Sequence, residues 1–433
     1  MSPKTLTAAV TEVTKHALVP KLRFPAFRGA LEWKETRLGQ LGELVSGLTY
    51  GPDDVRATGL LVLRSSNVQN GKIVLDDCVH VDPATKGANL SQVNDILICV
   101  RNGSVALIGK NALIPEGMPL CTHGAFMTVF RSKSAKFVFQ LFQSDKYQKQ
   151  VAGDLGATIN SINGGQFVKY AFAVPQPVEQ QKIADCLSSL DELIAALARK
   201  VDALKTHKKW LMQQLFPREG ETQPRLRFPE FRDAGEWGKG SLKGLCIRIM
   251  DGTHFSPKSK VGPRPYLTSK NIKEGRIDLS NLSYISEVEH ADIYSKCPVM
   301  TGDVLLTKDG ANTRNCAINN LDFEFSLLSS VAVLRGNPIK LHQKFLYQSM
   351  LSDSVQSLIS ESMAGQAITR ITLAKIGGFK ISVTSLPEQQ RIANCLTSLD
   401  DLITAATQEL ETLKTHKKGL MQQLFPAMQE VAP

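Results

Sequence analysis

The sequence predicts an α+β protein made of two copies of one arrangement, in which a globular α/β domain precedes a long helix. The first observation is a long segment that occurs twice, at 177–217 and at 386–426, with nearly the same residues. The second is a short marker that also occurs twice and is followed each time by a stretch of ordinary domain size. Because both features repeat in the same order, we interpret the chain as a tandem duplication.

The marker defines where each globular domain begins. It reads Pro-Lys-Leu-Arg-Phe-Pro-Ala-Phe-Arg from Pro20 and returns in similar form from Pro224, and a Glu-Trp pair follows each copy. The expected boundaries are, in chain order, an N-terminal extension at 1–18, the first domain at 19–176, the first helix at 177–217, the second domain at 218–385, the second helix at 386–426 and a tail at 427–433.

Each globular domain mixes strand and helix signals. Runs rich in β-branched residues predict strands, and runs with one apolar face predict amphipathic helices at 136–151 and 341–359. The strand runs lie at 59–63, 125–130, 330–334 and 379–383. The second long helix opens with a capping box, in which Ser385 and Glu388 bind free backbone N–H groups. Gln176 replaces the serine in the first copy.

Each long helix carries an apolar seam in alternating steps of four and three residues. Such a seam, sustained over several heptads, is typical of a coiled coil. A lysine interrupts it at the same place in both copies, at Lys208 and Lys417. The seam residues are Ile183, Leu187, Leu190, Ile194, Leu197, Val201, Leu204, Leu211 and Leu215 in the first copy, and Ile392, Leu396, Leu399, Ile403, Ala406, Leu410, Leu413, Leu420 and Leu424 in the second.

Three pairings are compatible with these seams: each helix on its own domain, a coiled coil between chains, or a pair within one chain. The last is favoured because the second helix is already tethered to the first. Since a domain's termini often lie close together, we expect the two helices to run antiparallel, and acidic first halves and basic second halves agree. The expected neighbours are Ile183 with Leu424, Leu197 with Leu410, Leu215 with Ile392, Lys208 with Leu399, Asp400 and Asp401, and Lys417 with Leu190, Asp191 and Glu192.

Composition favours a globular protein with a polyanionic partner. The chain has 433 residues and a formal net charge of +10. No apolar run is long enough to cross a bilayer, and the N-terminus lacks the apolar stretch of a signal peptide. The eight cysteines form no CxxC pair, so we expect neither a zinc ribbon nor a disulfide framework. A reduced, cytoplasmic protein fits these features.

The sequence offers no catalytic motif. It contains no Gly-rich phosphate loop, no HExxH and no Cys/His cluster at the spacing of metal ligands. His123, His254 and His290 are isolated, and the Asn-Pro-Pro-aromatic motif of amino-methyltransferases does not occur. We therefore expect a binding protein without catalytic residues, metal ligands or a cofactor of its own.

Several motifs, taken in their order and duplication, resemble the specificity subunits of type I restriction-modification systems. They are the Leu-Arg-Phe-Pro marker, Asp-Gly-Thr-His from Asp251, Gly-Asp-Val-Leu-Leu-Thr-Lys-Asp-Gly from Gly302, Glu-Gln-Gln-Lys/Arg-Ile-Ala at each helix start and Leu-Met-Gln-Gln-Leu-Phe near each helix end. The resemblance covers nearly the whole chain. The first half departs from it at Ser46-Gly47-Leu48-Thr49 and at Arg101-Asn102-Gly103.

The resemblance implies that the globular domains are target recognition domains, each of which reads one half of a bipartite, asymmetric site on double-stranded DNA. The paired helices then set the spacer between the half-sites and dock two modification (methyltransferase) subunits, and restriction subunits join the full complex. AdoMet and ATP are expected on those partner subunits.

Polar loop residues are the candidates for DNA contact, because Arg and Lys bind guanine edges, Asn and Gln bind adenine edges, and Ser and Thr bind bases or phosphates. For each single residue, a role in a turn or on the solvated surface is the alternative. The candidates in the first half are Thr49, Tyr50, Arg64, Ser65, Asn67, Arg101, Asn102, Asn160 and Ser161. Those in the second half are Thr253, His254, Thr268, Ser269, Lys270, Asn271, Lys308, Asp309, Arg314, Gln366, Thr369 and Arg370.

Trp210 is the candidate for a partner contact. It falls off the seam, at the position where the second helix has Gly419. An exposed tryptophan is a frequent interface residue, although Trp210 could instead pack on its own domain. An interaction scaffold with incidental basic charge is the alternative function, and a self-sufficient DNA-modifying enzyme would need a catalytic motif that we do not find.

Overall fold

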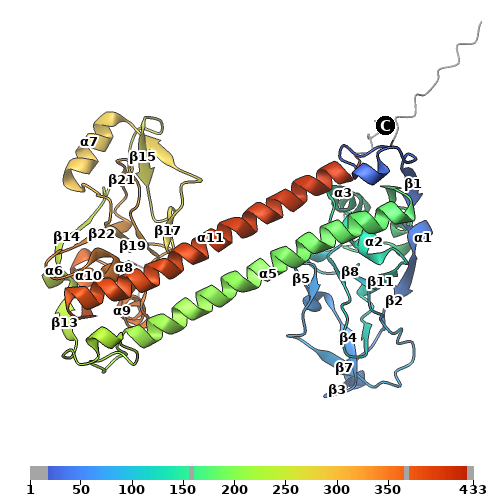
Figure 1. The fold of residues 1–433 in the computed structure, drawn as a ribbon, viewed down its shortest axis with the longest axis horizontal. Coiled ribbons are helices and arrows are strands. Elements are labelled where there is room, and N and C mark those ends of the chain that lie inside the picture. The colour runs from blue at the N-terminus through green and yellow to red at the C-terminus, as the bar shows by residue number, and fades with distance from the viewer. Residues whose placement is uncertain (1–17, 156–159, 365–369, 427–433) are drawn as a thin grey trace, which may run out of the picture. The chain divides into compact units, whose positions relative to one another are not determined.

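The fold is described from a computed structural model, which covers residues 18–155, 160–364 and 370–426. The chain divides into two compact units. Unit 1 consists of Met1–Ala196 with Leu410–Pro433, and unit 2 is the continuous stretch Leu197–Glu409. Each unit therefore holds one globular domain together with part of each long helix, as the ribbon shows (Figure 1).

Unit 1 is built on two sheets of four strands. Its strands are β1 (Lys34–Arg37), β2 (Glu43–Ser46), β3 (Val55–Arg56), β4 (Leu60–Leu63), β5 (Val68–Gln69), β6 (Lys72–Ile73), β7 (Val79–Val81), β8 (Ile96–Cys99), β9 (Asn111–Leu113), β10 (Cys121–His123), β11 (Met127–Arg131) and β12 (Ala171–Val174). Within the described residues, the sheet β2-β11-β8-β9 is antiparallel, and the sheet β10-β4-β7-β3 contains one parallel pair, β10 with β4. The pairs β1-β12 and β5-β6 complete the unit.

Helices cover the antiparallel sheet of unit 1. They are α1 (Leu38–Leu41), α2 (Ala135–Phe142), α3 (Asp145–Asp154) and α4 (Gly164–Phe167). Their apolar faces meet the sheet in one core, in which the rings of Phe130, Phe142 and Phe167 contact one another edge to face. The first residues of the first long helix join this core through Ile183 and Leu187.

Unit 2 repeats the plan with a different second sheet. Its strands are β13 (Gly238–Ser241), β14 (Cys246–Asp251), β15 (Arg264–Leu267), β16 (Ile272–Lys273), β17 (Arg276–Ile277), β18 (Ser283–Ile285), β19 (Val304–Thr307), β20 (Cys316–Ile318), β21 (Ser326–Leu327), β22 (Val331–Gly336) and β23 (Lys380–Val383). Its helices are α6 (Leu242–Leu245), α7 (Glu287–Lys296), α8 (Gln343–Leu351), α9 (Asp353–Met363) and α10 (Leu373–Gly378). Among the residues described, the sheets are β14-β22-β19-β20, β18-β15-β21, β13-β23 and β16-β17.

Both units confirm the α+β prediction, and the four strand runs predicted from β-branched residues correspond to β4, β11, β22 and β23. The two predicted amphipathic helices are each broken in two, which their apolar pattern did not indicate. Ser144 separates α2 from α3 and accepts a hydrogen bond from the Tyr147 N–H, and Ser352 separates α8 from α9. A serine hydroxyl competes for backbone groups and thereby ends a helix that the apolar pattern alone would continue.

The two long helices are α5 (Pro177–Leu215) and α11 (Leu386–Leu424), each of 39 residues. In unit 1 the start of α5 and the end of α11 share one core, which contains Ile183 and Leu424. In unit 2 the end of α5 and the start of α11 share another, which contains Leu215 and Ile392. The predicted antiparallel pairing is therefore confirmed. The expected pair Leu197–Leu410 falls on the division between the units and stays a prediction.

The seam lysines reach the predicted acids. Lys417 Nζ lies 2.6 Å from Asp191 in unit 1, and Lys208 Nζ lies 2.6 Å from Asp400 in unit 2. Each aspartate also accepts a hydrogen bond from a buried glutamine of its own globular domain, Gln140 at 2.9 Å and Gln348 at 2.8 Å. Each seam lysine is thus linked through an aspartate on the opposite helix to the globular domain.

The repeated marker fastens the start of one helix in each unit. The guanidinium of Arg23 binds Glu179 with two hydrogen bonds of 2.7 and 2.8 Å, and Arg227 binds Glu388 in the same way. All four side chains are almost completely buried. Glu388 therefore holds Arg227, and this use differs from the capping box that we predicted. The repeated Glu thus has a tertiary partner, and Glu388 also accepts a hydrogen bond from the hydroxyl of the nearby Thr384.

The tryptophan after each marker packs on the end of the other helix. The ring of Trp33 meets Phe425 at a centroid distance of 6.4 Å, and Trp237 meets Phe216 at 6.1 Å. The backbone agrees, because the Leu22 N–H donates to the carbonyl oxygen of Gln423 and its counterpart Leu226 donates to Gln214. Each globular domain thus holds the start of one helix and the end of the other, which explains why the helices are antiparallel.

Candidate nucleic-acid interface

Three loop segments of unit 1 that are far apart in the sequence meet beside the end of β8. The Asn102 amide donates to Ser65 Oγ at 3.1 Å, and Arg101 pairs with Ser161 through a β-bridge and a side-chain hydrogen bond of 3.5 Å. The Asn160 amide donates to the carbonyl oxygen of Gly103 at 3.3 Å. Five residues predicted as DNA contacts are therefore brought together: Ser65, Arg101, Asn102, Asn160 and Ser161.

A fourth loop segment of unit 1 packs against the second sheet, and a glycine makes this contact possible. Leu48 forms a parallel bridge with Gly124, and a Cβ on Gly47 would lie 2.2 Å from the Gly124 carbonyl oxygen, so only glycine permits this contact. Unit 2 repeats the feature, since Thr253 bridges Leu328 and a Cβ on Gly252 would lie 1.9 Å from the Leu327 carbonyl oxygen. The polar residues that follow, among them Thr49, Tyr50 and His254, are thereby placed next to the second sheet of each unit.

Unit 2 brings equivalent segments together with different side chains. Asp309 forms a β-bridge with Arg370, and the carboxylate lies 3.9 Å from the guanidinium. The Asn312 amide donates to the carbonyl oxygen of Ser269, and the Ser269 N–H donates to Ser330 Oγ. Gln366 and Thr369, which we also predicted as contacts, lie outside the described residues.

A polar pocket of about 520 Å³ opens in this part of unit 2. Four predicted residues line it: Thr268, Ser269, Lys270 and Asn271. Lys273, Asn281 and Asn312 also line it and were not predicted. Lys273 follows Lys270 on the same short loop and strand, so a wider window around the Ser-Lys-Asn motif would have included it.

Two predicted asparagines turn inward and shape their loops. Asn67 accepts from the Arg64 N–H and donates to the carbonyl oxygens of Val74 and Asp77. Asn271 makes the corresponding three bonds in unit 2, and both side chains are buried. Their hydrogen-bonding groups are occupied within the protein. We therefore assign Asn67 and Asn271 to the loop framework.

The two basic residues after β8 and β19 differ in their surroundings. Lys308 is 2% exposed, and its ammonium lies 3.0 Å from Asp251. Unit 1 has Ser46 in place of that aspartate, and Arg101 is exposed, with its guanidinium 5.9 Å from the centre of the Phe126 ring. A buried, paired lysine supports the fold, whereas an exposed arginine over an aromatic ring is available to a ligand.

The remaining candidates are surface residues with local partners. Arg64 pairs with Asp77, and Arg314 donates to Ser360 Oγ at 3.0 Å. Arg314 has a φ of 89°, a left-handed conformation that is uncommon for a non-glycine residue and is found preferentially at functional sites. His254 is exposed and lies 3.5 Å from Asp251.

Two exposed aromatic rings beside these loops were missed. Phe126 is 60% exposed and Phe255 is 82% exposed. Phe255 follows the Gly252–Thr253 segment, and Phe126 follows Gly124, which the Gly47–Leu48 segment contacts. An apolar residue in a polar loop is the signal that could have identified both. Of the other two histidines, burial lowers the pKa of His123, whose Nε2 lies 2.9 Å from the Val45 carbonyl oxygen. His290 is buried beside Ser326.

The described part of the chain shows no cluster of three or more His, Cys, Asp or Glu side chains that could hold a metal ion. None of its helices has the length and apolar character needed to cross a membrane.

Comparison with known proteins identifies the family. A sequence profile described as "Type I restriction modification DNA specificity domain" matches residues 31–231 and again residues 235–415. The chain belongs to the type I restriction-modification specificity subunits. The two matches together cover most of the chain, and their repetition agrees with the duplication seen in the fold.

Individual relatives carry the same description. The putative type I restriction enzyme MjaX specificity subunit of Methanocaldococcus jannaschii is 24% identical over 417 residues, which cover 91% of this chain and 93% of that protein. The MjaVIII specificity subunit of the same organism is 24% identical over 277 residues, and the match spans 62% of this chain and 64% of that subunit, slightly less than two thirds of it. The StySPI specificity subunit of Salmonella potsdam is 28% identical over 193 residues, 42% of this chain and 40% of that protein.

A solved structure supports the same fold. The crystal structure of the type I restriction-modification S subunit from M. genitalium superposes with a TM-score of 0.64 and 17% identity, over 95% of this chain and the whole of that one. At this identity the likeness concerns the fold.

As a type I specificity subunit, the chain is the non-catalytic component that gives the enzyme its DNA specificity. Membership of this family implies assembly with modification subunits and DNA. The cofactors of type I systems reside on the modification and restriction subunits.

Proposed function

We propose that the chain reads a bipartite, asymmetric DNA site, with one half-site bound by the target recognition domain at 19–176 and the other by the domain at 218–385. One observation carries the proposal: the two domains place different polar side chains on the same loop framework. Asn67 and Asn271 hold their loops by the same three hydrogen bonds. On this framework the bridged loop residues differ, because Arg101 faces Ser161 in the first domain and Asp309 faces Arg370 in the second.

The loop clusters carry the chemistry of base recognition. Exposed arginine and lysine side chains bind guanine in the major groove, asparagine binds adenine, and a carboxylate accepts a hydrogen bond from cytosine. Lys308, Asn67 and Asn271 hold the loops in shape. The proposed contacts are Thr49, Tyr50, Arg64, Ser65, Arg101, Asn102, Asn160 and Ser161 in the first domain, and Thr253, His254, Thr268, Ser269, Lys270, Asp309, Arg314 and Arg370 in the second.

An exchange of one domain tests this proposal. Residues 34–176 are replaced by the corresponding domain of another specificity subunit, and the methylated sequence is read by methylome sequencing of cells that carry the system. We expect one half-site to change and the other to stay as it was. A change in both half-sites contradicts independent reading, and failure of the wild-type complex to shift any specific duplex in an electrophoretic assay contradicts DNA recognition altogether.

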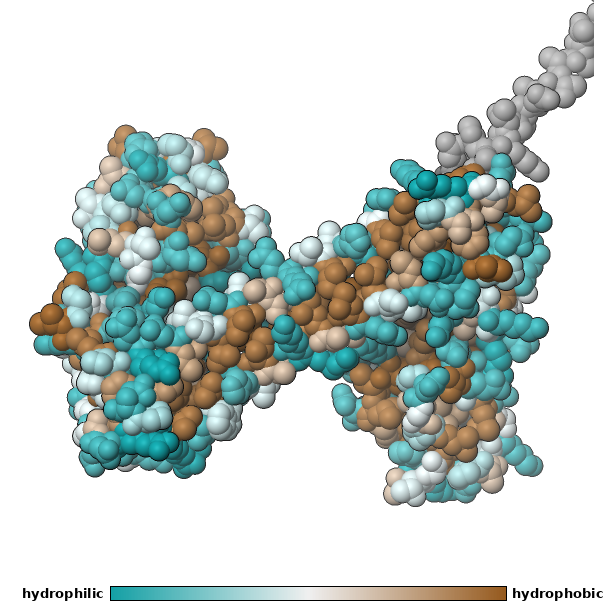
Figure 2. Space-filling model, in the orientation of Figure 1, coloured by the Kyte–Doolittle hydropathy of each residue, from teal (hydrophilic) through white to brown (hydrophobic). Residues whose placement is uncertain are grey.

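We further propose that α5 and α11 set the spacer and dock two modification subunits in the cytoplasm. Both helices expose a leucine away from the seam, Leu193 at 51% and Leu402 at 54%, and these residues hold equivalent positions in the repeat. On the face seen in Figure 2, hydrophobic residues also gather over parts of these helices. Apolar side chains repeated on two equivalent helices fit two copies of one partner.

Trp210 is a further proposed contact with the modification subunit, and it occurs on α5 alone. It is 50% exposed, and its ring stacks on His207 at a centroid distance of 6.0 Å. It is therefore not part of the core of unit 2. The exposure supports the proposed partner contact, because a half-buried tryptophan is a frequent anchor in protein interfaces.

A further inference from the structure

Phe255 of unit 2 is an aromatic residue that the proposed DNA contacts do not include. Its side chain is 82% exposed, more than any other Phe, Trp or Tyr in the described part of the chain. The Thr253 hydroxyl accepts a hydrogen bond from the Phe255 N–H at 3.2 Å, and Thr253 is itself held beside β21 by backbone hydrogen bonds to Leu327 and Ser329. A fixed turn therefore holds the ring in solvent, and a ligand that covers the ring gains free energy.

The loop that follows Phe255 is held at its other end by α7. The Glu289 carboxylate accepts hydrogen bonds from the backbone N–H groups of Lys258 at 2.7 Å and of Ser259 at 3.1 Å. The Ser259 hydroxyl accepts another from the Ser286 N–H at 2.9 Å. Because the loop is tied at both ends, its ordering on binding costs little entropy.

The exposed side of this loop is positively charged. Lys258 and Lys260 are exposed, and no salt bridge of Lys260 occurs within the described residues. Two nearby acids are used within the protein, because Asp251 pairs with Lys308 and Glu289 holds the loop backbone. An aromatic ring flanked by cations matches a nucleic acid, whose bases offer faces for stacking and whose phosphates pair with lysine.

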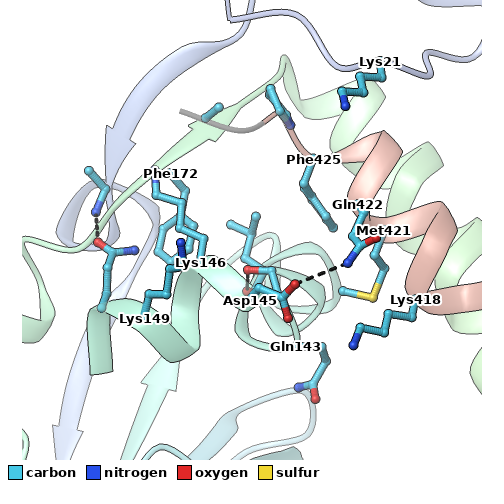
Figure 3. A pocket seen from close by; sticks show the side chains of 16 residues that line it. Lys21, Gln143, Asp145, Lys146, Lys149, Phe172, Lys418, Met421, Gln422 and Phe425 are labelled. Atoms are coloured by element: carbon cyan, nitrogen blue, oxygen red, sulfur yellow. Dashed lines mark hydrogen bonds between the residues drawn. The ribbon is translucent and has the colours of Figure 1, made fainter. Parts of the chain in front are cut away.

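Lysines also line a pocket of about 770 Å³ in unit 1, at the end of α11 (Figure 3). There the ammonium of Lys146 lies 5.7 Å from the centre of the Phe172 ring, and Lys146 and Lys149 both interact within the protein. Since these cations already have partners, the loop of unit 2 is better suited to a polyanion.

The loop begins at the wall of the polar pocket of unit 2. Leu328 lines that pocket and forms a β-bridge with Thr253, two residues before Phe255. Lys270, a proposed DNA contact, lines the same pocket. Phe255 therefore extends the proposed DNA-binding surface of the second domain.

The equivalent loop of unit 1 has a different character. Tyr50 stands at the position of Phe255, because the Gly-containing segments before them form equivalent bridges. Tyr50 is partly buried against the core of its own domain, and an acid, Asp53, replaces Lys258. The exposed ring beside lysines thus belongs to the second domain and not to the equivalent loop of the first.

We propose that Phe255 enters the DNA at the second half-site and stacks on a base, which opens one base step, while Lys258 and Lys260 pair with the neighbouring phosphates. The inference rests on the proposed reading of that half-site by the domain at 218–385. An inserted phenylalanine partly unstacks two base pairs, and pyrimidine–purine steps yield to this most easily. The second domain therefore reads part of its half-site through the deformability of the DNA, in addition to direct contacts with bases.

The test uses the full-length chain assembled with its modification subunits, and target duplexes that carry 2-aminopurine at one position of the second half-site at a time. The fluorescence of 2-aminopurine rises when the base is unstacked. The wild-type complex should therefore brighten one position beside the opened step, and Phe255→Ala should leave that position dark. The adenine that the methyltransferase extrudes should brighten in both complexes.

Affinity for the target duplex is the second readout. Phe255→Ala should raise the dissociation constant roughly tenfold, whereas Phe255→Trp keeps an aromatic face and should retain both the affinity and the fluorescence signal. The matched control is Val288→Ala, which removes an apolar side chain that is 81% exposed on α7, between Glu287 and Glu289. This variant should change neither readout.

Three results overturn the inference. The first is a wild-type complex that brightens no position besides the methylated adenine, and the second is equal fluorescence and affinity in wild type and Phe255→Ala. The third is loss of a modification subunit from the Phe255→Ala complex in mass photometry, which would make Phe255 a protein contact. A wild-type complex that binds no specific duplex would instead contradict the proposed reading of DNA on which the inference rests.

Discussion

At the scale of single residues, the surroundings of a cation decide whether it can reach DNA. Lys308 stands in a loop that resembles its counterpart in the family, yet the Asp251 carboxylate holds it in the interior. In unit 1 the place of Lys308 is taken by Val100. Arg101 lies one position further along its loop, where unit 2 has Asp309, and it stays on the surface. The sequence shows both as basic residues after a buried strand, so their different roles become visible only when the tertiary partner is known.

Substitutions in the second domain separate these roles. Lys270→Ala or Arg370→Ala should weaken binding of the assembled complex to its target duplex by about 1–3 kcal/mol, because each removes a side chain proposed to contact a base. The measurement is fluorescence anisotropy at fixed salt. Lys308→Ala should instead lower the thermal stability of the free subunit, since the mostly buried Asp251 carboxylate then lacks the Lys308 ammonium. Unchanged affinity and an unchanged methylation motif would place Arg370 among the solvated surface residues.

At the scale of elements, the Arg–Glu pairs fasten the long helices to their domains. Arg23→Ala leaves the Glu179 carboxylate buried without its cation and should reduce the free energy of unfolding by about 3–5 kcal/mol. Chemical denaturation followed by circular dichroism measures the change. The control is Arg391→Ala, which removes an exposed pair with Glu230 and should cost less than about 1 kcal/mol. Equal effects of the two variants would contradict the fastening role.

Trp210 is predicted to act through a partner rather than through the fold. Trp210→Ala should weaken the binding of one modification subunit and leave the melting temperature of the free chain nearly unchanged, because the ring is half exposed. Mass photometry and calorimetry give the two readouts. A large loss of stability in the absence of the partner would show that the tryptophan supports the domain instead.

The long helices were the most predictable elements, and the reason is physical. A seam of eighteen apolar positions specifies a helix through periodicity alone, and the lysines that interrupt it find acids at the predicted places. The breaks at Ser144 and Ser352 and the role of Glu388 could not be predicted in this way. The serine breaks depend on hydroxyl bonds to nearby backbone groups, and the role of Glu388 depends on a guanidinium that only tertiary packing brings close. Loop side chains are less predictable still, since their neighbours come from distant segments.

At the scale of the whole molecule, the length of the helix pair is predicted to determine the unread spacer. One heptad added to both α5 and α11 keeps every seam residue on the seam and lengthens each helix by about 10 Å. Methylome sequencing should then show a longer spacer between unchanged half-sites. An insertion of two residues in both helices is the control, because it turns the seam away from its partner and should abolish assembly. A spacer of unchanged length in the heptad variant would contradict this role of the helices.

The two units are built from different arrangements of chain segments, and this affects how the chain folds during synthesis. Unit 2 is continuous, from Leu197 to Glu409, whereas the core of unit 1 needs Met421 and Leu424 from the last turns of α11. The ribosome therefore delivers the first domain long before the residues that complete it. We expect the domain made second to reach its native core first, while the domain made first keeps part of its apolar surface exposed until translation ends.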